Sequence, residues 1–376
     1  MQARTYLFST LLASLIFATL VVAINAAVDP YGIIGTKRIA GFNQYKVDIN
    51  EHTRLTKKYQ PLFAVHNALI AGNSRVELGI NPLHPCFSKS GMFVYNVGIP
   101  GAGVRTQLEY ALNIIYQQPI ETVFLSVDFT DFISPDTQAI DSRSPLLEQS
   151  SGEFRYTSAG ELNPDYMESR FSDYMRSLFS LDALIASVKT MAFQSAAAPD
   201  RDEHGFNPAR DFAEAVRVEG PLALFEQKMV DLELKYSKPW YLRDSQGQLN
   251  SAFGDLDDFL DLAAERNIRV YLFTNPFHQS FWTLLRENGH MPAYQRWMHE
   301  LTETIRRHRD ADIVFWDFAQ DPSYISEPIP AKGVVSKPLE WFWEPAHYRR
   351  QLGDIMVDAL LAKSCETDAS YGHQVF

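Results

Sequence analysis

The sequence predicts an α/β protein with a three-layer, doubly wound parallel sheet of about five strands, a helical insertion and an N-terminal transmembrane helix. Three observations predict this fold. Five short apolar runs are rich in β-branched and aromatic residues and show little alternation, as strands covered on both faces do. Amphipathic helical patterns separate these runs, and strands that alternate with helices build parallel sheets with sites at the carboxyl ends of the strands. An uncharged stretch near the N-terminus is long enough to cross a membrane.

The elements of the predicted sheet domain can be placed along the chain. The expected strands are Ala68–Ala71, Met92–Asn96, Thr122–Asp128, Ile268–Thr274 and Asp312–Trp316. The expected helices, in which apolar residues recur at helical spacing, are Val104–Gln117, Leu256–Glu265, Pro292–Arg309 and Ala346–Ala362. Residues 364–376 have the composition of a loose polar tail.

Residues 136–253 interrupt this alternation. The segment contains polar loop stretches at Asp141–Gly160 and Ala196–Asn207, and helical stretches around Tyr166–Phe193 and Pro221–Tyr236. The flanking parts of the chain are long enough to form a complete core by themselves. We therefore expect a helical insertion that lies over one end of the sheet.

The apolar stretch at the N-terminus is Leu7–Ile24, which holds 18 residues and no charge. As a helix it reaches roughly 27 Å, close to the thickness of a bilayer's hydrocarbon core. A signal-peptide core is shorter, although Ala26 or Ala27 could serve as a cleavage site. A retained anchor over residues 1–27 is the favoured interpretation, and a cleaved signal or a buried core helix are the alternatives.

The distribution of charge sets the expected orientation and excludes some partners. Arg4 precedes the apolar stretch, which places the N-terminus in the cytoplasm and residues 28–376 outside it. The chain has 34 basic and 46 acidic residues, a formal charge of −12, and no basic run, which argues against a nucleic-acid groove. Uncharged or neutral partners are expected instead.

Cysteine and histidine spacing predicts no metal site. Cys86 and Cys365 show no zinc-type spacing, and could form one bridge or none. His204 and His290 have no ligand partners at metal spacing. The glycines of the chain lack the spacing of a dinucleotide site, so no cofactor is expected.

Three short segments near the predicted strand ends carry residues suited to chemistry. In the first, Gly72-Asn73-Ser74-Arg75 directly follows a strand, so a tight turn would present the hydroxyl of Ser74 beside helix N-terminal amides that stabilise negative charge. The plainer interpretation is that Asn73 or Ser74 only caps the following helix. In the second, Asn96 to Gly103 is glycine-rich, and Gly101 could donate its amide to an oxyanion, or the segment could be an ordinary loop.

The third segment is Glu344-Pro345-Ala346-His347, just before the last predicted helix. A carboxylate three residues ahead of a histidine can hydrogen-bond the imidazole, fix its tautomer and leave the other nitrogen facing a hydroxyl. A lone pair of this kind is a weak signal, because most such pairs are solvated helix starts.

Together the three segments resemble the conserved blocks of the SGNH (GDSL-like) hydrolase superfamily, in their order and in their positions on the sheet. Gly72-Asn73-Ser74 resembles the nucleophile block, and Asn96-x-x-Ile99-x-Gly101 resembles the second block, whose glycine donates to the oxyanion. Glu344-x-x-His347 resembles the closing Asp-x-x-His. The resemblance implies a flavodoxin-like sheet, Ser74, His347 and Glu344 as catalytic residues, and the amides of Ser74 and Gly101 as the oxyanion hole.

The similarity is closer to a subgroup of membrane-anchored periplasmic proteins related to alginate O-acetylation factors. It rests on the apolar anchor, Asp29-Pro30-Tyr31-Gly32, the 72–80 segment, Tyr95-Asn96-x-Gly98, Phe273-x-Asn275-Pro276 and Trp343-Glu344-x-x-His347-Tyr348. The subgroup implies a single-pass protein of a bacterial inner membrane with its main domain in the periplasm. It also implies an acyl donor, a polysaccharide or small ester substrate, and a possible multi-span membrane acyltransferase as partner.

Two departures from the superfamily pattern affect the expected chemistry. The closing acid is Glu344 in place of the usual aspartate, which is one methylene shorter. The strand end that normally carries an oxyanion-donating asparagine has Asp128, whose charge would oppose an oxyanion. Asp128, Arg75, Asn96 and His278 remain candidates for substrate contact, with a structural salt bridge for Arg75 and a loop position for His278 as alternatives.

The expected function is serine-dependent acyl-ester transfer or hydrolysis, acting as O-acetylation or deacetylation of an envelope or extracellular polysaccharide. The sequence does not choose between a sugar hydroxyl and water as the acceptor. The altered third block and the long insertion favour a second hypothesis, a catalytically weak glycan-binding or assembly protein of an exopolysaccharide complex.

Overall fold

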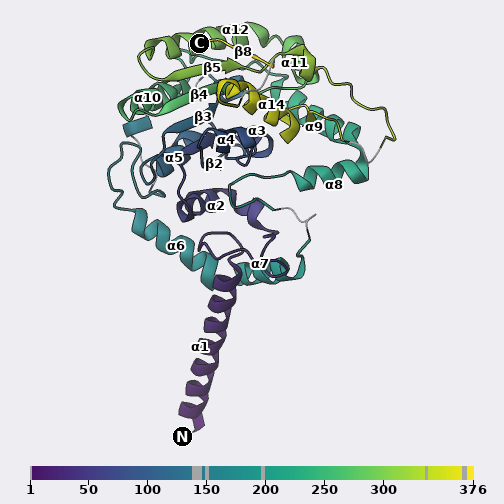
Figure 1. The fold of residues 1–376 in the computed structure, drawn as a ribbon. Coiled ribbons are helices and arrows are strands. Elements are labelled where there is room, and N and C mark those ends of the chain that lie inside the picture. The colour runs from purple at the N-terminus through teal and green to yellow at the C-terminus, as the bar shows by residue number, and fades with distance from the viewer. Residues whose placement is uncertain (1, 138–145, 149–151, 196–199, 335–337, 366–370) are drawn as a thin grey trace.

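A six-stranded sheet in the order β2-β1-β3-β4-β5-β8 forms the centre of the molecule (Figure 1). Its strands are β1 (Ala68–Ala71), β2 (Val94–Asn96), β3 (Thr122–Ser126), β4 (Arg269–Thr274), β5 (Ile313–Asp317) and β8 (His373–Gln374). The first five are parallel, and β8 runs antiparallel to β5. The chain moves from β1 outward to β2 and then back across to β3, so the carboxyl ends of β1 and β3 flank a topological switch point.

The computed structural model describes every residue except 1, 138–145, 149–151, 196–199, 335–337 and 366–370. The helices of the described residues are α1 (Gln2–Val28), α2 (Thr53–Tyr59), α3 (Ser74–Gly79), α4 (Pro85–Lys89), α5 (Val104–Ile115), α6 (Tyr166–Phe179), α7 (Leu181–Ala192), α8 (Arg210–Glu219), α9 (Pro221–Tyr236), α10 (Ser251–Glu265), α11 (Gln279–Glu287), α12 (Met291–Arg307), α13 (Pro322–Ile325), α14 (Arg350–Leu360) and α15 (Ala362–Cys365). A separate hairpin pairs β6 (Phe342–Glu344) with β7 (His347–Tyr348).

Both faces of the sheet are covered. Every residue of β1 and β3 is buried, and because strand side chains alternate between faces, neither face can be open to water. One group of helices, α5, α10 and α12, packs together, and a second group joins α3 to α14 and α4 to α15. The largest core cluster runs through the sheet and both groups.

The α/β class, the parallel sheet and all five expected strands are confirmed, with strand ends shifted by no more than two residues. The expectation of a loose tail at 364–376 is wrong for its described part. Tyr371 is fully buried and donates its hydroxyl to the Phe318 carbonyl at 3.0 Å, and His373–Gln374 pairs with β5. A two-residue strand has no periodicity, so its pairing could not be read from the local sequence.

The expected helix at Ala346–Ala362 is also wrong at its start. Residues His347 and Tyr348 are extended in β7, and α14 begins at Arg350. Glu344 and His347 are cross-strand partners in the hairpin, which fixes them opposite each other before the helix starts.

The segment 136–253 contributes helices α6 to α9 (Figure 1). The helical stretch expected at Tyr166–Phe193 is two helices, because Ser180 is extended and its hydroxyl accepts from the amide of Ala183 to cap α7. The stretch at Pro221–Tyr236 is α9 as expected, whereas α8 was not foreseen. Parts of the two expected polar loops, 141–145, 149–151 and 196–199, lie outside the described residues.

The N-terminal apolar segment is the long helix α1, which projects from the domain (Figure 1). Ala3–Val28 has a mean hydropathy of 2.5 over its most apolar window, of which only 6% is buried. The helix is therefore long and apolar enough to span a membrane, and almost none of its apolar surface is used in the domain's core.

Candidate active site

The turn at residues 72–74, which carries the candidate nucleophile and which we call the nucleophile turn, follows β1 directly. Gly72 has a φ of +155°, and a Cβ at this position would collide with the Ser126 hydroxyl, so the turn requires glycine. The Asn73 side-chain oxygen then accepts from the Arg75 amide at 3.0 Å and caps α3. Ser74 is the first residue of α3. The same turn therefore caps the helix through Asn73 and presents the hydroxyl of Ser74.

A histidine and a carboxylate from the other end of the chain complete a hydrogen-bonded series. Ser74 Oγ lies 2.7 Å from His347 Nε2, across 273 positions of sequence. His347 Nδ1 hydrogen-bonds Glu344 Oε1, whose second oxygen, Oε2, accepts from the Ala346 amide at 3.0 Å. The extra methylene of Glu344 is accommodated because the residue lies on β6, directly opposite the histidine on β7.

The environment of Glu344 favours its charged form. The side chain is buried, which acts to raise its pKa. The charge and hydrogen bond of His347, the charge of Lys228 and the Ala346 amide outweigh burial, and the pKa of Glu344 is lowered. An ionised carboxylate at this position keeps the proton of the neutral imidazole on Nδ1 and leaves Nε2 free to accept from the serine.

The Ser74 hydroxyl opens into a cavity of about 430 Å³ at the carboxyl edge of the sheet. Gly101 lines the same cavity with a φ of +68°, and no heavy atom lies within 4 Å of where its Cβ would be. The backbone at Gly101 is thus open to an approaching ligand. The amide of Ser74 belongs to the first turn of α3, where N–H groups have no acceptor within the helix.

Behind the nucleophile lies a buried polar network centred on Asp128. Its carboxylate accepts from Asn73 Nδ2 at 2.8 Å, Arg75 Nη1 at 2.8 Å and Asn275 Nδ2 at 2.9 Å. Arg75 also donates to the Ala346 carbonyl at 3.0 Å, so it joins the nucleophile turn to the segment 344–347. Asp128 lies behind the turn, outside the set of residues that line the cavity, with its charge paired to the guanidinium.

Two other expected contact residues lie away from the cavity. The Asn96 side chain is buried and donates to the carbonyls of Val76 and Ile80, while its oxygen accepts from the Gly98 amide. It therefore braces the loop that leads to Gly101.

His278 caps α11 through the Ser280 amide, and its Nε2 lies 2.8 Å from the Glu327 carbonyl oxygen. Burial lowers the pKa of His278, which favours the neutral, hydrogen-bonded ring. Both of its nitrogens are used within the fold, so the side chain has a structural role at the start of α11.

The insertion supplies one wall of the cavity, which the sequence analysis did not foresee. The lining residues from α9 are Lys228, Asp231, Leu232, Lys235 and Tyr236. They follow the spacing i, i+3, i+4, i+7 and i+8, which places them on one helix face. The sequence offered one signal of a binding face on α9, namely two lysines two turns apart. Using this signal would have required knowing that α9 packs over the strand ends.

Asp131, just beyond β3, also lines the cavity and was not singled out from the sequence. Burial and the neighbouring charge of Asp128 both raise the pKa of Asp131, and Arg75, Gln107 and Asn73 oppose them; the net result is a pKa of about 6. Asn73 Nδ2 donates to Asp131 at 3.0 Å as well as to Asp128. The residue that caps α3 is thus held by two carboxyl groups.

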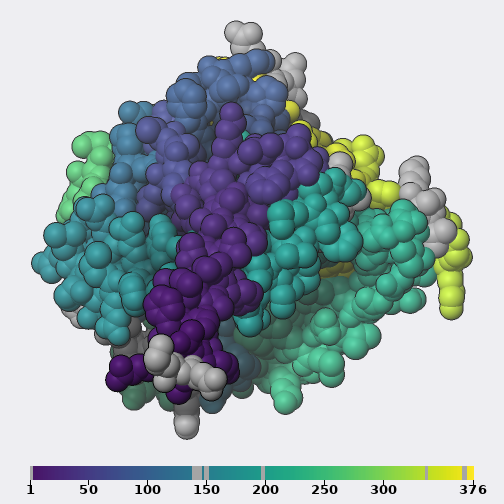
Figure 2. Space-filling view, turned by 90° about the horizontal axis from the view of Figure 1, so that it is seen from below, coloured from purple at the N-terminus to yellow at the C-terminus, as the bar shows by residue number. Residues whose placement is uncertain are grey.

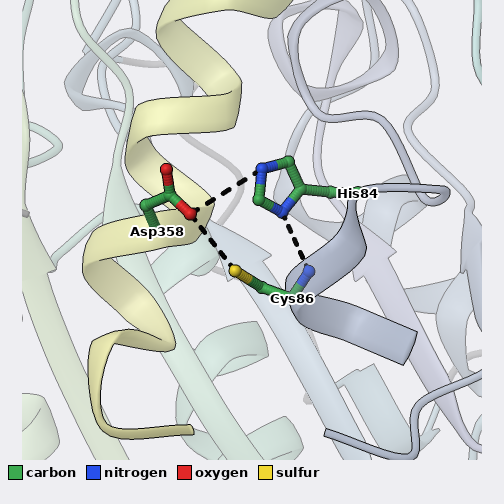
Figure 3. A group of neighbouring side chains, drawn as sticks. All are labelled: His84, Cys86 and Asp358. Carbon is green, nitrogen blue, oxygen red and sulfur yellow. Dashed lines mark hydrogen bonds and ion pairs between the residues drawn. The ribbon is translucent and has the colours of Figure 1, made fainter. Parts of the chain in front are cut away.

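A second group of side chains, His84, Cys86 and Asp358, lies between the start of α4 and α14 and has the residue types of a metal site (Figure 3). Cys86 is bonded to Cys365 in a disulfide, with the two Cα atoms 5.2 Å apart. Its sulfur therefore has no proton to donate to Asp358, 3.1 Å away, and no thiolate to offer a metal. The question of whether the two cysteines pair is answered by this bridge.

Comparison with models of known protein families gives no match to this chain, and comparison with curated proteins gives no related sequence.

Proposed function

We propose that this chain is a membrane-anchored, exported serine enzyme of the SGNH hydrolase type that transfers or hydrolyses an acyl ester. The proposed substrate class is the O-acetyl esters of an envelope or extracellular polysaccharide. The observation that carries the proposal is the 2.7 Å contact between Ser74 Oγ and His347 Nε2, with Glu344 on the other ring nitrogen. The position of this series at the carboxyl edge of a mostly parallel sheet supports it.

In the proposed mechanism the hydroxyl proton of Ser74 passes to Nε2 of His347 as Oγ attacks the acyl carbonyl carbon. The tetrahedral intermediate collapses, the ester oxygen of the donor leaves with the proton from Nε2, and an acyl group remains on Ser74. A sugar hydroxyl or water then gives its proton to Nε2 as it attacks the acyl carbonyl carbon. The Ser74 Oγ–acyl bond breaks and Oγ takes the proton from Nε2, which releases the acylated sugar or the free acid. Glu344 stabilises the imidazolium in both halves of the reaction.

The oxyanion is assigned to the amides of Ser74 and Gly101. Both residues line the cavity, the Ser74 amide lies in the first turn of α3, and the space beside Gly101 is open. Asp128 is excluded as a donor because an ionised carboxylate has no proton and its oxygens are already occupied by Asn73, Arg75 and Asn275. Two donors instead of three make a weaker hole, since one donor is worth roughly 10²- to 10³-fold in rate.

Two observations support export and anchoring at a bacterial inner membrane. The helix α1 has the length and composition of a membrane span. The Cys86–Cys365 disulfide is typical of an oxidising compartment such as the periplasm. A multi-span membrane acyltransferase is the partner that we propose as the source of acyl groups, on the sequence resemblance alone.

The central experiment is acylation of the purified full-length chain with a generic aryl acetate, followed by mass spectrometry of the serine peptide. We expect an acetyl group on Ser74, no adduct in Ser74→Ala, and adduct formation slower by roughly 10⁴-fold in His347→Ala. An adduct that forms equally in both variants would contradict the assignment.

Glu344→Gln tests the acid separately. The glutamine carbonyl can still accept from Ala346, so the hairpin should persist, but an amide N–H facing His347 Nδ1 favours the wrong tautomer. We expect a loss of roughly 10³- to 10⁴-fold in acylation rate with an unchanged melting temperature. Unchanged rates would remove Glu344 from the mechanism.

One observation favours a second candidate, a catalytically weak glycan-binding or assembly protein. The strand end where an oxyanion donor is expected carries Asp128, which is engaged in the network behind the turn. Absence of any Ser74 adduct, together with retained binding of an acetylated polysaccharide, would favour this role over catalysis.

A further inference from the structure

The two helices beside the anchor expose a row of large apolar side chains, which we call the apolar underside. Its members are Met167, Phe171, Met175 and Phe179 on α6 and Leu181, Ile185 and Val188 on α7, each between 37% and 68% exposed. On α6 the residues recur every fourth position, and on α7 they recur at i, i+4 and i+7, so each set forms one helix face. A contiguous exposed apolar surface of this kind marks a partner that is itself apolar.

The apolar underside lies at the point where α1 leaves the domain. Figure 1 shows α6 and α7 on either side of the upper end of α1, and Figure 2 shows the same arrangement from below. Asn25, in the last turns of α1, is fully buried and donates to the Leu178 carbonyl at 2.9 Å, and its oxygen accepts from Ser187 at 2.9 Å. These bonds fix the anchor to the α6–α7 junction.

The connection from α1 to the domain is equally fixed. The Asp29 carboxylate accepts from four successive amides, those of Ile33 to Thr36, at 2.9 to 3.3 Å. Lys46 Nζ donates to the Val28 carbonyl at 2.9 Å, which holds the end of the helix. Because the helix cannot swing freely, the bilayer that α1 crosses must meet the domain at a defined face.

We propose that α6 and α7 lie in the interfacial layer of this membrane and bury the apolar underside among lipid acyl chains. The inference rests on the anchoring that is part of the proposed function and is independent of its serine chemistry. The apolar stretch Leu7–Ile24 of α1 reaches roughly 27 Å, which matches the hydrocarbon thickness. It ends next to Asn25, which bonds to the α6–α7 junction, so α6 and α7 lie at the boundary of the hydrocarbon. Amphipathic helices bind this boundary in the plane of the membrane.

Burial of apolar surface, rather than charge, drives this contact. The exposed Arg170 and Arg176 of α6 are balanced by the exposed Glu168 of α6 and Asp182 of α7. The exposed Lys189 of α7 is paired with Asp48. We therefore expect the same depth of insertion in neutral vesicles and in vesicles that contain anionic lipid.

The test uses the full-length chain, with its disulfide intact, reconstituted in phosphatidylcholine vesicles that carry spin-labelled lipid. An environment-sensitive fluorophore is attached at Phe171→Cys or Ile185→Cys. The matched controls are Val230→Cys and Leu234→Cys, which are equally exposed apolar residues on α9, a helix far from α1 in Figure 1. Leu15→Cys reports on α1 itself.

We expect quenching by the lipid spin label at least two-fold stronger at 171 and 185 than at 230 and 234. Quenching at position 15 without quenching at 171 or 185 would overturn the interfacial contact while leaving the anchor in place. If position 15 is also unquenched, the anchoring fails, and the interfacial contact fails with it. Serine acylation, measured on the same samples, tests the enzymatic proposal separately.

Discussion

At the residue scale, Lys57 is a buried lysine that holds the glycine-rich loop from Asn96 to Gly103 in place. Its ammonium group donates to the carbonyls of Asn96, Gly98 and Gly205 at 2.6 to 3.1 Å and lies 3.3 Å from Glu77. Burial lowers the pKa of Lys57 to about 7, against the raising effect of Glu77. The loop that it holds leads directly to Gly101.

Lys57→Met leaves three carbonyls without their donor and Glu77 with one buried cationic partner fewer. We expect a loss of about 3–5 kcal/mol in the free energy of unfolding, measured by denaturant titration. Lys189→Met is the matched control, because its pair with Asp48 is half-exposed and worth at most about 1 kcal/mol. Equal losses of unfolding free energy in the two variants would show that the buried contacts of Lys57 stabilise the fold no more than an exposed ion pair does.

Asp131 makes stability depend on pH in a defined window. Its pKa is raised from 3.8 to about 6, so between these values the folded protein holds a proton that the unfolded chain has lost. The stabilisation of the fold by this bound proton is fully present below about pH 4 and is lost as the pH rises through about 6.

Asp131→Asn keeps an oxygen that can accept from Asn73 and Gln107 and has no proton to lose. We expect the unfolding free energy of the variant, relative to the parent, to increase by on the order of 3 kcal/mol between pH 4 and pH 7. Urea titrations across this range measure it, with Asp231→Asn as the control for a carboxylate lost from the same cavity. Parallel profiles for parent and variant would contradict the role of Asp131.

At the scale of elements, the sequence predicted the pieces with strong periodicity and missed those made by long-range pairing. The runs at 122–128 and 268–274 are buried on both faces, and their apolar character alone identified β3 and β4. The strand β7 was included in the helix expected at Ala346–Ala362, and β6 was not expected as a strand. Pairing with β6, which the local sequence does not encode, holds His347 and Tyr348 in a strand instead of a helix.

The same limit applies to the candidate site. Ser74, Gly101 and His347 could be named because each follows a strand or precedes a helix in a recognisable motif. Lys228 and the other α9 residues could not, because nothing in the sequence of an insertion indicates which strand ends it covers.

The α9 wall should control the size of acyl group that reaches Ser74. Asp231→Trp adds a large ring at an exposed position on the cavity wall, so the fold should tolerate it. We expect the rate of acylation by a bulky aryl ester to fall at least ten-fold more than that by an aryl acetate. Val230→Trp changes the adjacent residue, which is exposed and does not line the cavity, so it should change neither of the two acylation rates nor the melting temperature. Equal losses for both esters would show that α9 does not limit access.

At the scale of the whole molecule, the candidate site is assembled from segments near both ends of the domain. The nucleophile turn belongs to α3, and the acid and histidine belong to the hairpin that precedes α14. The two helices approach so closely that a Cβ on Gly353 would collide with the Gly79 carbonyl oxygen. The 2.7 Å contact between Ser74 and His347 therefore depends on how the C-terminal part of the chain is held against the N-terminal part.

The Cys86–Cys365 disulfide holds these two parts together, because it joins α4 to the end of α15 across 279 positions. Closing so long a loop removes much of the freedom of the unfolded chain, and the chain-entropy account gives about 5.6 kcal/mol for such a bridge. We expect reductant to lower the unfolding free energy by up to this amount and to slow Ser74 acylation as the Gly79–Gly353 contact loosens. Guanidinium titrations with and without reductant measure the first effect, and the double variant Cys86→Ser/Cys365→Ser should match the reduced parent and ignore reductant. A double variant as stable as the oxidised parent would mean that helix packing alone brings His347 to the serine.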